Sequence, residues 1–302
     1  MRRGCSMATV GQILRQLRVD KNLTQREVAA GIMSRSHLSE LEHGDYYPAY
    51  DTMLALLRRL NVTLKEFQTE IGAASDEPGR AYIQHTNHLS TEQKLPELER
   101  YLTDVFTDDV ARGDLRLRMK RLNMLGLVNF ELHPQTVDLN DYQPIFDYLL
   151  GCQNWHEYEI RLLANSIFLA RYDVAKMLAK QFTTKGKRVH FNDFKIKVAL
   201  FFHNLMETAL DHGEDKLARQ YAEQSLFYSK AAHNLSFQID AEIFLAMIEL
   251  RAGRNGVENQ QKIEHRITMF DELGYQDVAK SCRQALQKYV FNRSDGASSD
   301  LK

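Results

Sequence analysis

The stretch LTQREVAAGIMSRSHLSELEHG, residues 23–44, contains two short runs of helix-forming residues separated by a break at residues 32–34. Thr24 precedes the first run and Glu27 follows it at the three-residue spacing of a capping box, so we expect Thr24 to cap this helix. Ser34 is a good N-cap for the second run, because its hydroxyl can accept a hydrogen bond from a free N–H of the first turn. The stretch therefore predicts two short helices joined by a tight turn.

The second of these helices has both an apolar and a polar face. Leu38 and Leu41 are three residues apart and are expected to face inward, and Gly44 is expected to end the helix. A scaffold helix, a turn and a second helix predict a helix-turn-helix, whose second helix enters the major groove of DNA with its N-terminal residues on the bases. The candidate base-contacting residues are the remaining polar ones: Ser34, Arg35, Ser36, Ser39 and Glu40.

Three residues outside the second helix are candidate contacts to the DNA backbone. Gln25 begins the first helix of the pair, where free backbone N–H groups suit a phosphate. Arg15 and Arg18 lie about one turn apart in the preceding helical segment, TVGQILRQLRVDK at residues 9–21, and could flank the backbone. The alternative is that the polar residues act only as caps and that the arginines are solvated.

The chain has 302 residues, enough for one large or two ordinary domains, with 39 Lys and Arg against 40 Asp and Glu. Because the whole chain is nearly neutral, its total charge does not indicate a nucleic-acid partner. Residues 1–67 carry 10 basic and 7 acidic residues, a net charge of +3, and the remainder carries −4. A mildly basic small domain followed by a mildly acidic large one favours DNA binding by the first.

The three cysteines, Cys5, Cys152 and Cys282, are far apart in the sequence. Their odd number and wide spacing argue against a disulfide framework and against a zinc site. The N-terminal residues MRRGCSMATV lack the apolar core of a signal peptide, and apolar runs such as VALFF, residues 198–202, are too short to cross a membrane. We therefore expect a cytoplasmic protein with no membrane partner and no cofactor.

The helical segments predict an all-α fold with two domains. Glycines and prolines are few, at 15 and 5, and no segment alternates apolar and polar residues as a strand would. We expect a five-helix helix-turn-helix domain at residues 9–71, with Asp51 as the cap of the fourth helix and Thr63 as the cap of the fifth. Residues 72–89 include the small, polar stretch GAASDEPGR, which indicates a linker.

Residues 90–292 are expected to form about five pairs of amphipathic helices separated by short turns. In EDKLARQYAEQSLFYSKA, residues 214–231, apolar side chains recur at helical spacing, with alanines where two helices must approach closely. This pattern is typical of a tetratricopeptide-like α-solenoid, in which each pair buries its apolar face against the next. The ends outside these domains, residues 1–8 and 293–302, are expected to be a disordered extension and a disordered tail.

The sequence resembles a known family at these residues. LTQREVA followed by SRSHLSELEHG is similar to the pattern of Cro/repressor-type helix-turn-helix proteins, with a break one residue shorter than usual. This shortening, together with NWHEYEIRLLANSIFLARYDVAKMLAKQF at residues 154–182, resembles the Rgg/MutR-type regulators of Gram-positive bacteria. The resemblance covers residues 9–289.

The resemblance implies a homodimeric transcription regulator of the quorum-sensing type. Its N-terminal domain would bind an inverted-repeat promoter site in double-stranded DNA, and its repeat domain would dimerise and bind a short linear signalling peptide, a pheromone. RNA polymerase is a further candidate partner. Some relatives carry a cysteine just after the recognition helix, whereas GDYYPAYD, residues 44–51, has none, so we expect no disulfide between subunits there.

A solenoid offers a concave surface to an extended peptide, whose backbone needs hydrogen-bond partners. Asn165 and Asn204 each carry a donor and an acceptor in the middle of a predicted helix, where asparagine is disfavoured, and in peptide-responsive relatives such asparagines bind ligand backbone. Arg161 lies four residues before Asn165, on the same face, and is a candidate partner for a peptide carboxylate. Phe168 and Phe201 are candidates for side-chain pockets. The alternatives are inter-helix hydrogen bonds for the asparagines and core packing for the phenylalanines.

No motif supports an enzyme or a metal site. His85 and His88 have a metal-like spacing but no third ligand nearby, and HEYEI, residues 156–160, lacks the second histidine of HExxH. A Gly-rich phosphate loop and a GxSxG motif are also absent from the sequence. Two alternatives to a peptide-responsive regulator stay open: a helical-repeat scaffold that binds a partner protein, and a regulator with no peptide ligand.

Overall fold

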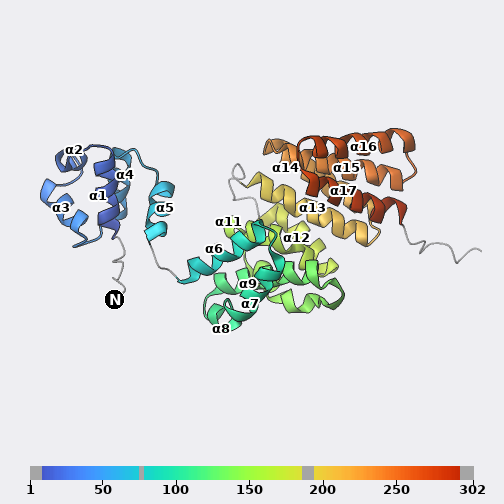
Figure 1. Cartoon of the computed structure of the whole chain (residues 1–302), viewed down its shortest axis with the longest axis horizontal. Helices are drawn as coiled ribbons and strands as arrows, with labels where there is room; N and C mark the ends of the chain where they lie inside the picture. The colour runs from blue at the N-terminus through green and yellow to red at the C-terminus, as the bar shows by residue number, and fades with distance from the viewer. Residues whose placement is uncertain (1–8, 75–77, 186–193, 293–302) are drawn as a thin grey trace, which may run out of the picture. The chain divides into compact units, whose positions relative to one another are not determined.

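The computed structural model describes residues 9–74, 78–185 and 194–292, and its regular structure there consists of helices without strands (Figure 1). The predicted all-α class is therefore confirmed for these residues. The two ends that we expected to be disordered lie outside the described residues.

Contacts within the chain divide it into two compact units, residues 1–88 and 89–302. The division lies inside a helix, α6 (Pro78–Thr91), and not in an irregular segment. The helix before it, α5 (Leu64–Ala74), also extends into the predicted linker at residues 72–89, so most of that linker is helical. No helix of the described parts is long and apolar enough to span a membrane.

The head, by which we mean α1 to α5, surrounds a small apolar core. Leu38 and Leu41 are buried in it as predicted, together with apolar side chains from the other four helices. Gly11 allows two of the helices to touch, because a Cβ atom there would lie 1.7 Å from the carbonyl oxygen of Leu41. The helices of the head are α1 (Val10–Asp20), α2 (Gln25–Ala29), α3 (Arg35–His43), α4 (Tyr50–Arg59) and α5.

The helix starts in the head follow the predicted caps with one exception. Thr24 accepts a hydrogen bond from the N–H of Glu27, and the Glu27 carboxylate accepts one from the N–H of Thr24, which completes the predicted capping box. Thr63 starts α5 through the same arrangement. The prediction that Asp51 caps the fourth helix is wrong, because α4 already begins at Tyr50. Asp51 lies in its first turn, where a negative charge favours the helix N-terminus.

The repeat domain, by which we mean residues 89–292, consists largely of helices that succeed one another across short turns. From α13 to α17 each helix packs against the next, and α11 packs against α13. Short 3-10 turns follow two of the helices: η1 (Pro134–Thr136) and η2 (Leu139–Tyr142) after α9, and η3 (Ile167–Leu169) after α11. The helices after α6 are α7 (Leu95–Asp104), α8 (Asp108–Ala111), α9 (Leu115–Leu132), α10 (Gln143–Gly151), α11 (Glu157–Ser166), α12 (Tyr172–Lys185), α13 (Lys195–Asp211), α14 (Asp215–Ala231), α15 (Leu235–Arg251), α16 (Gly256–Glu272), α17 (Gln276–Leu286) and a final π turn, η5 (Gln287–Phe291).

Small residues let these helices approach one another. Ala218 and Ala222 of α14 are fully buried, and the hydroxyl of Ser225 on the same helix donates to the carbonyl of Ala199 on α13 at 3.0 Å. Gly213, with a φ of +70°, forms the turn between these two helices in the left-handed conformation that glycine adopts without strain. The tetratricopeptide-like packing expected from the sequence is confirmed here.

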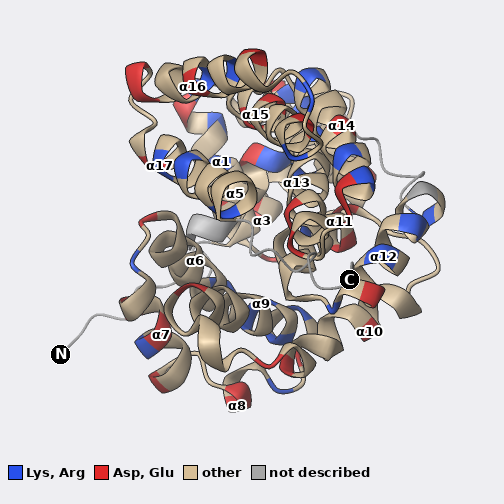
Figure 2. Cartoon of the chain, turned by 90° about the vertical axis from the view of Figure 1, so that its right-hand side faces the viewer, with Lys and Arg blue, Asp and Glu red and all other residues tan. Residues whose placement is uncertain are grey.

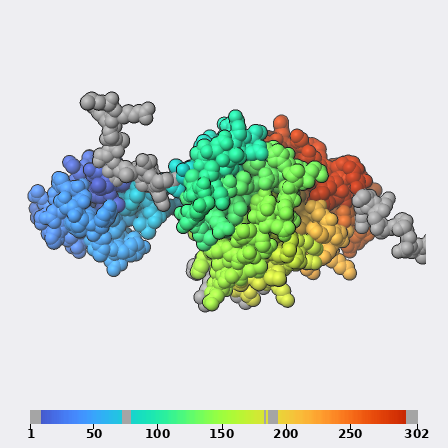
Figure 3. Space-filling view, turned by 90° about the horizontal axis from the view of Figure 1, so that it is seen from below, coloured from blue at the N-terminus to red at the C-terminus, as the bar shows by residue number. Residues whose placement is uncertain are grey.

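The superhelix brings the first helices of the repeat domain beside its last. One cavity is lined by the end of α6, α7 and α9 on one side and by α17 on the other. Figure 3 shows the same proximity, with the teal and green segments directly beside the red ones. Acidic and basic residues are interspersed over the repeat domain (Figure 2), so a binding site must be recognised by local charge patterns.

Candidate functional site

The first turn of α3 presents polar side chains to solvent. Ser34 is its N-cap, and the Ser34 hydroxyl accepts a hydrogen bond from the N–H of His37 at 3.1 Å. Ser34 therefore has the capping role that the sequence left open as the alternative. The other predicted base-contacting residues stay accessible, Ser39 only in part: Arg35, Ser36, Ser39 and Glu40.

Arg18 and Gln25 point inward, toward Glu42. The Arg18 atoms Nε and Nη2 lie 2.6 and 2.8 Å from the two carboxylate oxygens of Glu42, and Nη1 donates to the carbonyl of Leu23 at 2.9 Å. The Gln25 amide donates to the same carboxylate at 3.0 Å. The side chains of Glu42 and Arg18 are 2% and 12% exposed. One buried carboxylate therefore joins α1, α2 and α3.

This network gives Arg18 and Gln25 a structural role in place of the predicted contact with the DNA backbone. Burial opposes the charge of Glu42, but the hydrogen bonds from Arg18 and Gln25 outweigh it and lower the pKa of the carboxyl. Because the Arg18 guanidinium and the Gln25 amide are engaged within the head, they position α3 and are poorly placed to contact a DNA phosphate. Arg15, on the exposed side of α1, adds its charge to the lowering of the Glu42 pKa, but its side chain is exposed to solvent.

Three exposed residues near α3 were not selected from the sequence. His37 lies in the first turn of α3, and Tyr47 and Tyr50 are 77% and 65% exposed just beyond the helix. The hydroxyl of Tyr46 donates to the carbonyl of His37 at 3.1 Å and holds this loop against α3. The sequence signal for these tyrosines was the aromatic run DYYPAY, residues 45–50, which follows Gly44 at the predicted end of the helix.

A cavity of about 880 Å³, the central cavity, lies within the repeat domain. Of the predicted peptide-binding residues, Asn204 lines it, together with Leu200 and His203 from the same helix, α13. Polar residues predominate elsewhere on its wall: Ser90, Gln93, Glu131, Ser236, Asp240, Asp277, Lys280, Ser281 and Gln284. A cavity with many hydrogen-bonding groups suits a ligand with a polar backbone.

The predicted asparagines meet at the C-terminal end of α11, where helix carbonyls lack partners within the helix. The Asn204 amide donates to the carbonyl of Ala164 at 3.1 Å, and Asn123 of α9 donates to the carbonyl of Asn165 at 2.7 Å. Asn204 therefore makes the inter-helix hydrogen bond offered as the alternative, and it also lines the cavity. The Asn165 side chain is half-buried.

The two predicted phenylalanines have different surroundings. Phe201 is 1% exposed and packs against Phe182 and Phe202, with ring centroids 5.3 and 5.0 Å away. Phe201 therefore packs in the core, the alternative role that the sequence left open for it. Phe168 is half-buried and lies edge-to-face with the exposed Phe130 at 5.2 Å, so it stays near the surface.

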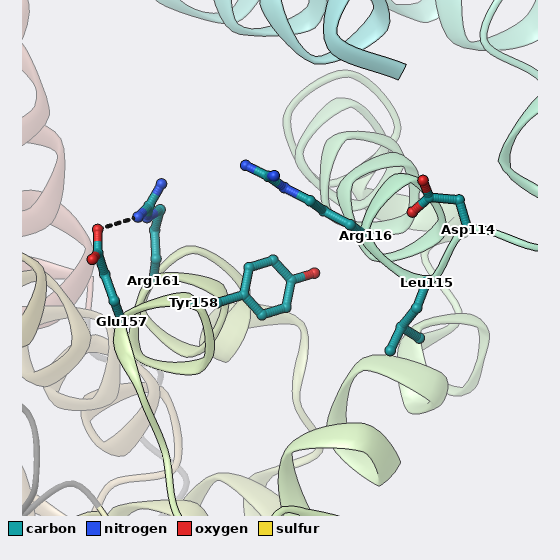
Figure 4. A pocket seen from close by; sticks show the side chains of 6 residues that line it. All are labelled: Asp114, Leu115, Arg116, Glu157, Tyr158 and Arg161. Atoms are coloured by element: carbon teal, nitrogen blue, oxygen red, sulfur yellow. Dashed lines mark hydrogen bonds and ion pairs between the residues drawn. The ribbon is translucent and has the colours of Figure 1, made fainter. Parts of the chain in front are cut away.

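Arg161 lines a second cavity of about 630 Å³, the side cavity, formed by the starts of α9 and α11. Figure 4 shows the ring of Tyr158 between the side chains of Arg161 and Arg116. Arg161 is half exposed and forms an ion pair with Glu157 at 2.6 Å. The structure thus places Arg161 away from the central cavity that Asn204 lines.

A buried ionic cluster lies at the wall of the central cavity and was missed in the sequence. His203 forms ion pairs with Asp240 of α15 at 2.8 Å and with Glu207 at 3.4 Å. Burial opposes the charge of His203, but Asp240 and Glu207 outweigh it and hold the pKa of the imidazole well above its usual value. The local signals were the polar pair His203–Asn204 within LFFHNLMETAL, residues 200–210, and Glu207 four residues after His203 on the same helix.

Two family models match the chain. The model of the C-terminal domain of "HTH-type transcriptional regulator Rgg" matches residues 83–284, more than half of the chain. A helix-turn-helix model matches residues 14–67. The two matches fall on the repeat domain and on the head.

Several solved structures have the same fold. A putative transcriptional regulator from Listeria monocytogenes EGD-e is 18% identical over 95% of this chain and 98% of its own, with a TM-score of 0.73. A variant of the Streptococcus dysgalactiae SHP pheromone receptor Rgg2 is 20% identical over 93% and 99%, with a TM-score of 0.72. Bacillus thuringiensis PlcR, in complex with the peptide PapR7 and DNA, is 14% identical over 92% and 99%, with a TM-score of 0.68. At these identities the likeness establishes the fold.

Proposed function

The chain belongs to the Rgg family of HTH-type transcriptional regulators, and we propose that it binds a promoter site through α3 and a short linear peptide through the repeat domain. One observation carries the proposal: each unit leaves polar groups accessible, the head at the first turn of α3 and the repeat domain at the central cavity. A protein of this fold, PlcR, is known with a peptide and DNA bound together.

In the proposed DNA complex, α3 enters the major groove with its first turn on the bases. Arg35 can donate two hydrogen bonds to a guanine, and Ser36 can reach a neighbouring base edge. Glu40, one turn after Ser36 on the same face, can accept from a cytosine amino group. Arg15 is the candidate phosphate contact, and the Glu42 network holds α3 in place while these contacts form.

The DNA part is tested by selecting duplexes that bind the full-length chain and measuring mobility shifts against the selected and a scrambled duplex. Arg35→Ala should cost about 1–3 kcal/mol on the selected duplex only, because it removes base readout. Arg15→Ala should weaken both duplexes alike and reduce the salt dependence. The orientation proposed for α3 is wrong if Arg35→Ala leaves the preference for the selected duplex unchanged.

We propose further that two copies bind an inverted-repeat site, since a two-fold dimer presents two recognition helices to two half-sites. The repeat domain offers exposed apolar residues for such an interface, among them Phe227 and Leu235 on either side of the turn between α14 and α15. Light scattering of the full-length chain at micromolar concentration should give the mass of a dimer, and the mass of a monomer would refute this part.

In the proposed peptide complex, the ligand lies extended along α11 and α13, and side-chain amides pair with its backbone. Asn165 has its amide half-buried at the end of α11, and Asn204 keeps its amide oxygen for a ligand while its NH₂ group binds Ala164. Asn165→Ala should therefore weaken a bound peptide by about 1–3 kcal/mol and barely change the thermal melting temperature.

A matched control for this variant is Asn259→Ala on α16, where the side chain donates to the carbonyl of Arg254 outside both cavities. Peptides are obtained by affinity selection from a synthetic library of short peptides with the full-length chain. A lower melting temperature with unchanged peptide affinity in Asn165→Ala would make Asn165 a structural residue. Capture of no peptide would favour a regulator without a peptide ligand.

A further inference from the structure

Two arginine side chains line the side cavity from neighbouring helices. Arg116 lies in the first turn of α9 and Arg161 in the second turn of α11, and these two helices pack against each other. Figure 4 shows the Arg116 side chain extending across the cavity toward Arg161, with the ring of Tyr158 between them. The cavity therefore presents two planar guanidinium groups, each with several N–H donors, to the same space.

The two arginines differ in their partners. Arg161 is paired with Glu157 at 2.6 Å, in an ion pair that is about half exposed. Arg116 forms no ion pair with any residue that the structure describes. Asp114, the second carboxylate of the wall, caps α9 by accepting the N–H of Leu117. Because exposed ion pairs contribute little stability, an incoming anion can take N–H donors of Arg161 at small cost.

Two lysines add positive charge beside these arginines. Lys120 lies one turn after Arg116 on α9, and the charge of Arg161 acts on Lys197 of α13. Burial and Arg161 lower the pKa of Lys197, and burial and Lys197 lower the pKa of Lys120 to about 8. A carboxylate partner would raise a lysine pKa, so these directions show that burial and like charge outweigh the carboxylates here.

The side cavity and its surroundings therefore carry an excess of positive charge. Two arginines and two lysines lie near two carboxylates, which leaves a net charge of +2 when both lysines are protonated. An anion bound among these cations would offset the repulsion between them. Lowered lysine pKa values at a cavity are also typical of functional sites.

The remaining wall of the side cavity is apolar. Leu115 is 50% exposed, and the ring of Tyr158 is half-buried between the two arginines. An exposed leucine and an aromatic ring beside cations suit a ligand that combines an anionic part with an apolar or aromatic part. The cavity volume of about 630 Å³ lies within the range of small-molecule sites.

The side cavity is separate from the central cavity. Along α9, Asn123 lies between Arg116, which lines the side cavity, and Leu127, which lines the central one. Asn123 is buried, and its amide donates to the carbonyl of Asn165 and to the hydroxyl of Ser166. A ligand of the side cavity therefore binds apart from the central cavity.

We propose that the side cavity binds a small organic phosphate, with the phosphate group between Arg116 and Arg161 and the organic part against Tyr158 and Leu115. A phosphate monoester is close to a dianion at neutral pH, and three of its oxygens accept hydrogen bonds, so it can engage both guanidinium groups. A carboxylate carries one charge on two oxygens and satisfies one guanidinium. Such a ligand is distinct from the promoter DNA and the peptide of the proposed function.

Isothermal titration calorimetry of the full-length chain with adenosine monophosphate, ribose phosphate, adenosine and succinate tests the class of ligand. Adenosine monophosphate should bind, and ribose phosphate should bind several-fold more weakly, because it has no aromatic ring to lie against Tyr158. Adenosine lacks the phosphate, and succinate carries its two charges on separate carboxylates, so both should bind at least about tenfold more weakly than adenosine monophosphate. Adenosine or succinate binding as tightly as adenosine monophosphate, or no phosphate binding at millimolar concentration, would overturn the proposal.

Variants place the bound nucleotide in the side cavity. Arg116→Gln and Arg161→Gln should each weaken adenosine monophosphate about tenfold or more, since each removes charge-assisted hydrogen bonds to the phosphate. Tyr158→Leu should weaken adenosine monophosphate to the affinity of ribose phosphate and leave ribose phosphate unchanged. Nucleotide affinity that is unchanged in both arginine variants would place the nucleotide elsewhere and contradict the proposal.

The matched control is Arg219→Gln, which should leave nucleotide binding unchanged. Arg219 is 42% exposed in an i,i+4 ion pair, much like Arg161 at 45%, but lies outside both cavities. Urea midpoints from the fluorescence of the buried Trp155 show whether each variant is folded.

The lysines provide a second readout. A dianion bound beside Lys120 raises its pKa, so binding of adenosine monophosphate at a pH near 8 should take up protons. The phosphate itself is already fully ionised at that pH. Titrations in two buffers of different ionisation enthalpy measure the uptake, and its absence would place the phosphate away from the lysines, against the proposal. Displacement of the nucleotide by the selected DNA duplex would make the cavity a contact for DNA phosphates and overturn the assignment to a small molecule.

Discussion

Buried ion pairs occur in both units, and the one around Glu42 in the head differs from the one around His203 in the repeat domain in what surrounds it. In the head, the carboxylate of Glu42 is enclosed by hydrogen bonds from Arg18 and Gln25. In the repeat domain, His203 and Asp240 are paired with each other and also line the central cavity. The first cluster is closed within the protein, and the second borders a space that a ligand can enter.

This difference suggests how the two units work. A closed network holds α1, α2 and α3 in one arrangement, so the recognition helix needs little ordering when it meets DNA. A cluster at a cavity wall keeps polar groups available at the surface where a flexible peptide must be oriented. We therefore expect substitutions in the Glu42 network to cost stability and DNA binding together, and substitutions at the wall of the central cavity to affect mainly ligand binding.

The largest effect is expected from Gly11→Ala, because the added Cβ atom meets the backbone of Leu41, which cannot rotate away. We expect a loss of roughly 3–5 kcal/mol from the stability of the head and loss of DNA binding. Gly126→Ala in the repeat domain is the comparison, since the atoms nearest to its Cβ atom belong to the side chain of Leu169, which can move. That change should cost about 1–2 kcal/mol.

Amide hydrogen exchange across α1 to α3 and across α9 measures the two effects in the full-length chain. Similar losses in both variants would show that the close approach of α1 and α3 is no more constrained than the packing of α9.

The second effect concerns the closed network. Glu42→Ala leaves the guanidinium of Arg18 and the amide of Gln25 without their acceptor, at a cost of about 3 kcal/mol. Glu42→Gln retains one oxygen acceptor and should cost clearly less. Urea unfolding followed by hydrogen exchange in α1 to α3 distinguishes the two. If Glu42→Ala is as stable as the unchanged chain, the network does not hold the head together.

The third effect is a dependence on pH with opposite signs in the two units. Glu42 has a pKa below the ordinary value of 4.5, so its contribution to stability is present above that pH and is lost as the pH falls through the lower, folded pKa. His203 has a pKa well above 6.5, so its contribution is present below that pH and is lost as the pH rises through the folded pKa. Acid should therefore weaken the head and alkali the repeat domain.

The single tryptophan makes the second half of this prediction measurable. Trp155 is fully buried in the repeat domain, so its fluorescence reports the unfolding of that unit. Urea midpoints from Trp155 should fall as the pH rises from 6.5 to about 8, and they should fall less in His203→Gln. Above that range the lowered pKa of Lys120, about 8, acts in the opposite direction. Amide exchange in α3 between pH 5 and pH 3 reports the head, with Glu42→Gln as its control. A repeat domain whose midpoint rises with pH in this range would contradict the sign.

The smallest effect distinguishes the two predicted asparagines. Asn204→Ala removes the hydrogen bond to the carbonyl of Ala164 and should lower the stability of the repeat domain by about 1 kcal/mol. Asn165→Ala should leave the stability of the repeat domain nearly unchanged. Asn123 donates its hydrogen bond to the backbone carbonyl of Asn165, which the substitution retains. Trp155 fluorescence during urea unfolding measures the stability of both variants. Equal losses of stability would show that the two side chains have the same structural role.

Local signals in the sequence predicted much of the fold. The capping box at Thr24 and Glu27, the cap at Ser34 and the inward Leu38 and Leu41 are all present as expected. These features depend on residues within a few positions of one another, so periodicity and capping chemistry suffice to find them. Asp51 does not cap the fourth helix, because α4 begins one residue earlier, at Tyr50, without a side-chain cap. A helix can begin without such a cap, so the presence of Asp51 did not fix its first residue.

The roles that the sequence could not predict depend on contacts between distant segments. Arg18 turns inward because Glu42, 24 residues later, accepts two of its hydrogen bonds. Phe201 is buried because α12 and α13 enclose it, which helical spacing within α13 does not reveal. The ionic cluster of His203 forms only when α15 brings Asp240 beside α13. The sequence therefore predicted Asn204 as a residue of the candidate site. It did not predict the charged residues His203 and Asp240 that line the same cavity.

The central claim is that separate surfaces of this chain bind DNA and a peptide. Hydrogen–deuterium exchange of the full-length chain tests it most directly, with the chain alone, with the selected DNA duplex and with the selected short peptide. We predict that the duplex protects α2 and α3, and that the peptide protects α9, α11 and α13 without protecting α3. The account would be contradicted if the peptide protected α3, or if it protected none of α9, α11 and α13.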